Sequence, residues 1–158
     1  MNKKGFSLVE LMVVVAIIAF LAMVAVPSFT KFLSKAKRAE AYMNLGSIYT
    51  GQKAYWAENG RYTSVLSGRD GIGWQPEGYT GGGLKEKFYY TYGFAEGSEG
   101  QNYFTGKLNA PSSALRSAKA DQNGFVASAA ADIDGDGGYD VLTVDQSNNL
   151  KLEQDDLA

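Results

Sequence analysis

A chain of 158 residues is long enough for one modest domain, and its formal net charge of −2 is too small to indicate a nucleic-acid partner. The absence of cysteine excludes disulfides and thiolate metal sites, and the absence of histidine removes the commonest general base and transition-metal ligand. The spacing of Ser, Asp, Glu and Lys suggests no nucleophile paired with a base, so we do not expect an enzyme.

The amino-terminal part of the chain contains an unbroken apolar run from Leu11 to Val26. Extended back to Phe6 it comprises 21 residues, 6 through 26. As a helix this segment measures about 31 Å, which matches a hydrocarbon core of about 30 Å. No small-residue cleavage site follows the run, so we expect residues 6–27 to form a transmembrane helix rather than a secretory signal peptide.

One carboxylate, that of Glu10, lies within this apolar helix. A charged side chain at mid-membrane costs roughly 2.5–3.5 kcal/mol and is a functional candidate by default. Alternatively, Glu10 lies at headgroup depth, where its negative charge suits a helix N-terminus. Taken alone, the residue leaves both interpretations open.

The residues around Glu10 form a specific pattern. The stretch Lys3-Lys4-Gly5-Phe6-Ser7-Leu8-Val9-Glu10 resembles the prepilin signal of type IV pilins and the related pseudopilins. That signal has a short basic leader, a glycine before the cut, an aromatic first mature residue and a glutamate four residues later. Pro27 also stands where the family has its helix-bending proline.

This resemblance implies a processing and assembly mechanism. A prepilin peptidase would remove leader residues 1–5 by cutting between Gly5 and Phe6, and would N-methylate Phe6. The new α-amino group, with an ordinary pKa of about 7.7–8.0, would be mostly cationic and could pair with Glu10 of an assembled neighbour. Glu10 and Pro27 are therefore the expected assembly residues.

The resemblance also implies partners, location and roles. The chain would polymerise with copies of itself, served by an inner-membrane assembly platform, an assembly ATPase and a secretin. It would lie in the bacterial inner membrane before assembly and in an extracellular pilus afterwards. The pilus would support adhesion, twitching motility or DNA uptake.

Residues 28–56 continue the helical pattern in amphipathic form. A mostly apolar stripe recurs at spacings of four and three and should pack on a sheet. It consists of Ala41, Leu45, Ile48, Gln52 and Tyr55. The opposite side is charged and is expected to be a solvated face. Its residues are Lys35, Lys37, Arg38 and Glu40. Asn59-Gly60 should end the helix, with Gly60 as a left-handed cap.

The remainder, residues 57–158, is expected to form a globular domain. Residues 63–84 are rich in Gly and Ser and predict a connecting loop. Four strands are predicted after it, over residues 87–94, 103–108, 124–130 and 140–144. The fold class is therefore α+β, with the long helix packed on a small antiparallel sheet of about four strands.

An acidic segment near the carboxyl end suggests a cation site. Asp132, Asp134, Asp136 and Asp140 occupy relative positions 1, 3, 5 and 9, with a glycine at 6, as in the opening of a calcium loop. The twelfth position is Thr143 rather than Glu, and Asp145 is a candidate substitute ligand. The alternative is an Asp/Gly turn whose side chains cap its own backbone. No cofactor is required, and calcium is the one ion that the pattern suggests.

Two other functions remain open at this point. The stretch Asp132–Gln146 is similar to the carboxyl-terminal segment of some pilins, and type II secretion pseudopilins use calcium near this end. A pseudopilin that forms a short periplasmic piston is the first alternative to a pilus subunit. A membrane-anchored calcium-binding module that never polymerises is the second.

Overall fold

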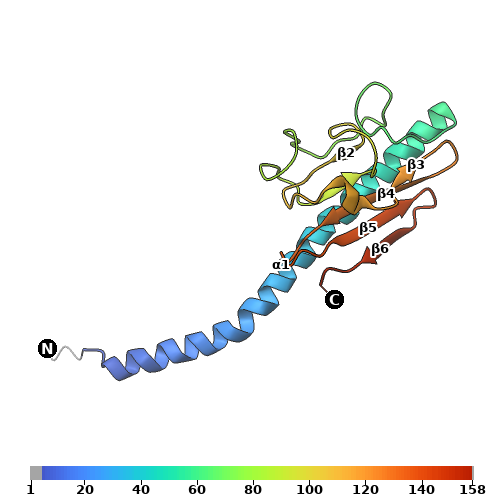
Figure 1. Cartoon of the computed structure of the whole chain (residues 1–158). Helices are drawn as coiled ribbons and strands as arrows, with labels where there is room; N and C mark the ends of the chain where they lie inside the picture. The colour runs from blue at the N-terminus through green and yellow to red at the C-terminus, as the bar shows by residue number, and fades with distance from the viewer. Residues whose placement is uncertain (1–4, 158) are drawn as a thin grey trace.

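The computed structural model describes residues 5–157 and confirms an α+β fold in which one long helix packs on an antiparallel sheet (Figure 1). The helix, α1, spans Leu8–Asn59. The strands are β1 (Thr91–Gly93), β2 (Tyr103–Phe104), β3 (Lys119–Ala120), β4 (Phe125–Ala131), β5 (Asp140–Asp145) and β6 (Leu150–Gln154). A short 3-10 helix, η1, covers Ser112–Leu115.

Local signals define both ends of α1. Ser7 is the N-cap and forms a capping box with Glu10, which satisfies backbone N–H groups that the first turn leaves without partners. At the other end, Gly60 adopts the left-handed conformation, with φ 67°, and its N–H bonds to the carbonyl of Trp56. A residue with a Cβ would be strained there, so the predicted end at Asn59-Gly60 is confirmed.

Pro27 lies inside α1, and the helix continues through it. Proline has no N–H, so the hydrogen bond to the carbonyl of Met23 is lost and the turn is crowded. Figure 1 shows that the helix curves along its free part instead of running straight. A missing helical hydrogen bond at Pro27 is an identifiable cause of such bending.

The two parts of α1 have different surroundings. Every described residue before Ser34 is exposed, including Phe20 at 68%, and this part projects from the domain (Figure 1). By length and composition, α1 is apolar enough to cross a membrane. The boundary between the free and packed parts of α1 lies at Ser34.

The packed part of α1 buries the predicted stripe. Ala41, Leu45, Ile48 and Gln52 are completely buried, and Tyr55 is half-buried. Gln52 is the polar member, and its side-chain amide donates to and accepts from the backbone of Thr63. Those bonds satisfy a polar group that would otherwise be costly to bury.

The sheet has the strand order β2-β1-β4-β5-β6, with β3 paired to β4, and all of these pairs are antiparallel. The face of β4 toward the main core carries Ala127, Ala129 and Ala131, all fully buried with Leu45 and Ile48 of α1. Successive residues of a strand point to opposite faces, so Ala130 packs in the second core with Leu115. The small alanines let the helix approach the central strand closely.

The first two predicted strands are much longer than those observed. Of residues 87–94 only Thr91–Gly93 is a strand, and of 103–108 only Tyr103–Phe104. The remaining segments run side by side through isolated bonds, from Lys107 N to Phe88 O and from Leu108 N to Tyr89 O. A Cβ on Gly106 would collide with the carbonyl oxygens of Tyr89 and Tyr90, so the close approach of these two segments requires glycine at this position.

The sheet also has two strands that the sequence analysis did not predict. β3 is very short, whereas β6 forms an edge of the sheet next to β5. In β6 the exposed residues Lys151 and Glu153 alternate with half-buried neighbours. Charged side chains on an edge strand oppose pairing with other chains. The sheet therefore has six strands instead of about four.

Candidate functional site

The residues predicted for processing lie just before α1. Gly5 and Phe6 are exposed and precede the N-cap, Ser7, so the peptide bond between them is outside the helix. Lys3 and Lys4, the basic residues of the predicted leader, lie outside the described residues. The geometry leaves the proposed cleavage position sterically accessible.

Glu10 contacts the N-terminus of its own helix. Its Oε2 accepts hydrogen bonds from the backbone N and the hydroxyl of Ser7, both at 3.0 Å. The backbone N of Glu10 donates to the Ser7 hydroxyl at 3.2 Å. In the isolated chain the carboxylate is thus part of a helix cap, and it remains exposed to whatever surrounds α1.

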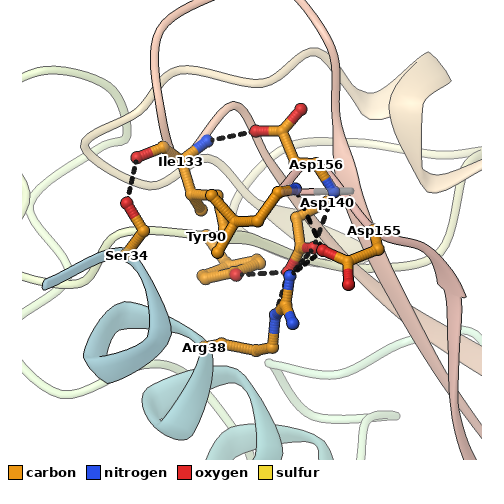
Figure 2. Close-up of polar contacts among 8 residues, drawn as sticks. Ser34, Arg38, Tyr90, Ile133, Asp140, Asp155 and Asp156 are labelled. Carbon is orange, nitrogen blue, oxygen red and sulfur yellow. Dashed lines mark hydrogen bonds and ion pairs between the residues drawn. The ribbon is translucent and has the colours of Figure 1, made fainter. Parts of the chain in front are cut away.

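A polar network joins α1 to the carboxyl-terminal part of the chain, and Asp140 is its centre (Figure 2). The Asp140 carboxylate is completely buried and is bound by the guanidinium of Arg38 through two hydrogen bonds, of 2.9 and 2.6 Å. The Tyr90 hydroxyl donates to it at 2.7 Å, and the backbone N of Asp156 at 3.2 Å. Arg38 also binds Asp155 at 2.6 Å.

The network changes the proton affinities of its members. Burial alone would lower the pKa of Arg38, but its hydrogen bonds with Asp140 and Asp155 outweigh burial and raise that pKa. Burial, and then the bond to Asp140, raise the pKa of Tyr90. The arrangement keeps the Arg38 guanidinium cationic and the Tyr90 hydroxyl neutral.

The prediction of a solvated charged face on α1 was wrong for three of its four residues. Arg38 is in the network, and Lys37 donates to the carbonyl of Ile133 at 2.9 Å. Glu40 accepts from the backbone N of Tyr89 at 2.9 Å and from the Tyr92 hydroxyl at 2.8 Å. Only Lys35 is fully exposed, because the loop and the acidic turn cover the sides of the helix next to the sheet.

Three of the four predicted calcium ligands lie together. Asp132, Asp134 and Asp136 are grouped with Asp156, with one carboxylate oxygen from each within 4.8 Å of the others. Asp140 is not in this group, because Arg38 and Tyr90 bind its carboxylate. Asp145 is also elsewhere, accepting from the backbone N of Ser147 and Asn149 at 2.8 and 3.0 Å.

Asp156 is the residue that sequence reasoning missed. Its position beside the acidic turn depends on the antiparallel pairing of β5 with β6, which returns the chain to the turn. Its Oδ2 accepts from the backbone N of Ile133 at 2.8 Å. Burial raises the pKa of Asp156, as do the neighbouring charges of Asp134, Asp132 and Asp136, against the lowering effect of the Ile133 bond.

The acidic turn also caps itself. Asp132 accepts from the backbone N of Gly135 at 2.6 Å and of Gly137 at 3.0 Å. Asp136 accepts from Gly138 at 2.7 Å. These bonds are those of the self-capped turn considered from the sequence, although each carboxylate keeps lone pairs for a cation. Calcium binding stays a prediction, now with Asp156 as the fourth carboxylate.

Comparison with known proteins identifies the chain's relatives. Residues 1–26 match the model of the prokaryotic N-terminal methylation motif. The chain is 45% identical over 76 residues to the type IV major pilin protein PilA of Myxococcus xanthus (strain DK1622), covering 48% of this chain and 33% of PilA. Over about half of its length the chain is therefore similar to type IV pilins. Similarity to these structural proteins agrees with the expectation that the chain is not an enzyme.

Two further similar proteins come from other bacteria. The chain is 39% identical over 71 residues to the fimbrial protein EcpB of Eikenella corrodens, covering 45% of this chain and 44% of EcpB. It is 33% identical over 76 residues to the type IV major fimbrial protein FimA of Dichelobacter nodosus, covering 46% and 43%. The chain thus matches from a third to less than half of the length of these curated relatives.

Proposed function

We propose that this chain is the structural subunit of a type IV pilus, cut after Gly5 and polymerised through α1. The observation that carries the proposal is the largely apolar part of α1 from Leu8 to Leu33, in which every residue is exposed. Exposed apolar surface of this extent requires lipid or other apolar helices around it. A membrane before assembly and a bundle of α1 helices afterwards supply those surroundings.

Cleavage would convert the helix cap into an assembly contact. Removing leader residues 1–5 creates an α-amino group on Phe6, which the prepilin peptidase would then methylate. Among the described residues, Glu10 is bound only by Ser7, so its carboxylate can exchange that partner for the amino group of a neighbour. Because an unmatched buried charge is heavily penalised, Glu10 would select the register between helices as well as add affinity.

The rest of the proposal follows from polymerisation by one repeated contact. A contact between unlike surfaces that does not close a ring produces an open helical polymer. Residues 6–27 would form its core, residues 28–56 would join the core to the domain, and residues 57–158 would lie outward. Pro27 would let the free part of α1 bend to fit the bundle.

The machinery and the cellular roles are proposals of the same kind. The chain would pass from the bacterial inner membrane to an extracellular pilus through an assembly platform, an assembly ATPase and a secretin. Adhesion, twitching motility and DNA uptake are the roles that we propose for the pilus as a whole.

Mass spectrometry of protein sheared from intact cells tests this proposal. We expect an abundant chain that begins at N-methylated Phe6. A processed chain confined to membranes would favour a pseudopilin instead, and an unprocessed chain that still begins at Met1 would contradict the proposal.

A further inference from the structure

A groove of about 630 Å³ lies where α1 leaves the folded domain. One wall is a part of α1 that includes Lys31 and Lys37. The other wall comes from the acidic turn and the chain end, and carries Asp134, Asp136 and Asp156. The groove therefore has a cationic side and an acidic side that face each other.

The two walls are not joined by ion pairs. Within residues 5–157 the only ion pairs are the two that Arg38 makes, and Arg38 does not line the groove. Lys37 donates one hydrogen bond to the Ile133 carbonyl, which leaves two of its three N–H donors available. Opposite charges are thus held apart across a space that can take a small group carrying both.

The groove lies at a definite depth relative to the apolar run. Thr30 and Lys31 line it and follow Val26 by four and five residues, which places them about 6–8 Å beyond the run in a helix. A bilayer has a hydrocarbon core of about 30 Å and a total thickness of about 40–45 Å, so each headgroup layer is roughly 5–8 Å thick. If α1 spans a membrane, the mouth of the groove opens into the headgroup layer.

We propose that, before polymerisation, this groove binds the headgroup of an aminophospholipid from the leaflet that the domain faces. The lipid phosphate would accept hydrogen bonds from Lys31 and Lys37. The primary ammonium would donate to Asp134, Asp136 and Asp156. The inference rests on the proposed function, because it requires α1 to lie in a membrane before it enters a filament.

The chemistry of the walls selects among lipids. Phosphatidylethanolamine carries a phosphate and an ammonium with three N–H donors, so it satisfies both walls. The trimethylammonium of phosphatidylcholine has the same charge but no N–H to donate to a carboxylate. Phosphatidylglycerol carries the phosphate without a cation, and therefore leaves the acidic wall unpaired and repels it.

Native mass spectrometry of the full processed chain in detergent tests the inference. The chain is offered equal amounts of the three lipids with identical acyl chains, in EDTA so that no divalent cation occupies the acidic wall. We expect phosphatidylethanolamine to be retained roughly three- to ten-fold over phosphatidylcholine, the scale of the net contribution of one ordinary hydrogen bond.

Single substitutions on each wall supply the decisive comparison. Lys31→Gln and Asp134→Asn should each remove the preference, whereas Lys35→Gln, on the same helix but outside the groove, should keep it. Circular dichroism checks that each variant is folded. Equal retention of the three lipids, or a preference for phosphatidylglycerol that only the lysine substitution changes, would overturn the inference.

Flotation with lipid vesicles separates this inference from the proposed function. A chain that fails to float with phosphatidylcholine vesicles would contradict the membrane stage of the proposed function itself. A chain that floats with all vesicles but retains no lipid selectively would overturn only the headgroup site.

Discussion

The Arg38 guanidinium on α1 binds the buried Asp140 carboxylate at the start of β5 through two hydrogen bonds, of 2.9 Å from Nε and 2.6 Å from Nη2. The two residues are 102 positions apart. Through Asp155 and the backbone of Asp156, the same contact fixes the end of the chain beside the helix (Figure 2).

Removing one partner of this pair should destabilise the domain strongly. Arg38→Met leaves the Asp140 charge buried without its cation, and we expect a loss of about 3–5 kcal/mol in the free energy of unfolding. Urea unfolding monitored by Trp fluorescence measures it. Lys35→Met, an exposed position on the same helix, should stay within about 0.5 kcal/mol of the parent chain. Equal effects of the two substitutions would contradict the role assigned to the pair.

The acidic group should make stability depend on pH through Asp156. The pKa of this carboxyl is raised in the folded state, so the folded chain binds the proton more tightly than the unfolded chain does. Its contribution is therefore most favourable at low pH, and it is lost as pH rises through the folded pKa. In EDTA, the melting temperature of Asp156→Asn should be equal to or lower than that of the parent chain near pH 4. As the pH rises, the melting temperature of the variant should increase relative to that of the parent chain. A difference in melting temperature that does not change between pH 4 and pH 7 would refute this assignment.

If the predicted site binds calcium, the ion should reduce the repulsion among the carboxylates of Asp132, Asp134, Asp136 and Asp156. We expect isothermal titration calorimetry to give a dissociation constant of about 0.1–1 mM, the range of extracellular calcium modules. Asp134→Asn and Asp156→Asn should each weaken binding. Asp145→Asn is the matched control, because Asp145 caps a different turn. Absence of binding heat, with an unchanged melting temperature in calcium, would leave only the self-capped turn.

The assembly role of Glu10 predicts a separation between processing and polymerisation. Glu10→Gln keeps a side chain that can accept from Ser7 but loses the charge needed to attract a neighbour's amino group. We expect the chain to be cut after Gly5 and retained in the membrane while pili disappear from the sheared fraction. Glu58→Gln, an exposed position at the far end of α1, should leave the pili unchanged. Normal piliation of the Glu10 variant would argue for a chain that assembles without this contact.

Features controlled by neighbouring residues could be predicted from the sequence. The apolar stripe of α1 and the glycine cap at Gly60 follow from helical periodicity and from the ease with which glycine adopts positive φ. The Asp-rich turn could also be predicted, because Asp132, Asp134 and Asp136 are close together in the sequence.

The errors concern contacts between distant segments. Arg38 looks solvent-facing by helical position, and nothing local to it reveals a buried carboxylate 102 residues away. Asp140 fits a calcium-loop spacing, but in the folded chain its carboxylate is hydrogen-bonded by Arg38 and Tyr90. Asp156 joins the acidic group only because β6 pairs with β5, a strand pairing that the sequence analysis did not predict.

The Asp140 network determines which redox conditions the domain can fold in. It closes the carboxyl-terminal region with hydrogen bonds and an ion pair in a chain that has no cysteine. Folding of this region therefore needs no thiol-oxidising enzyme and no shuffling of mispaired bridges. A reductant should leave the domain intact, and a subunit that unfolds can refold in either an oxidising or a reducing environment.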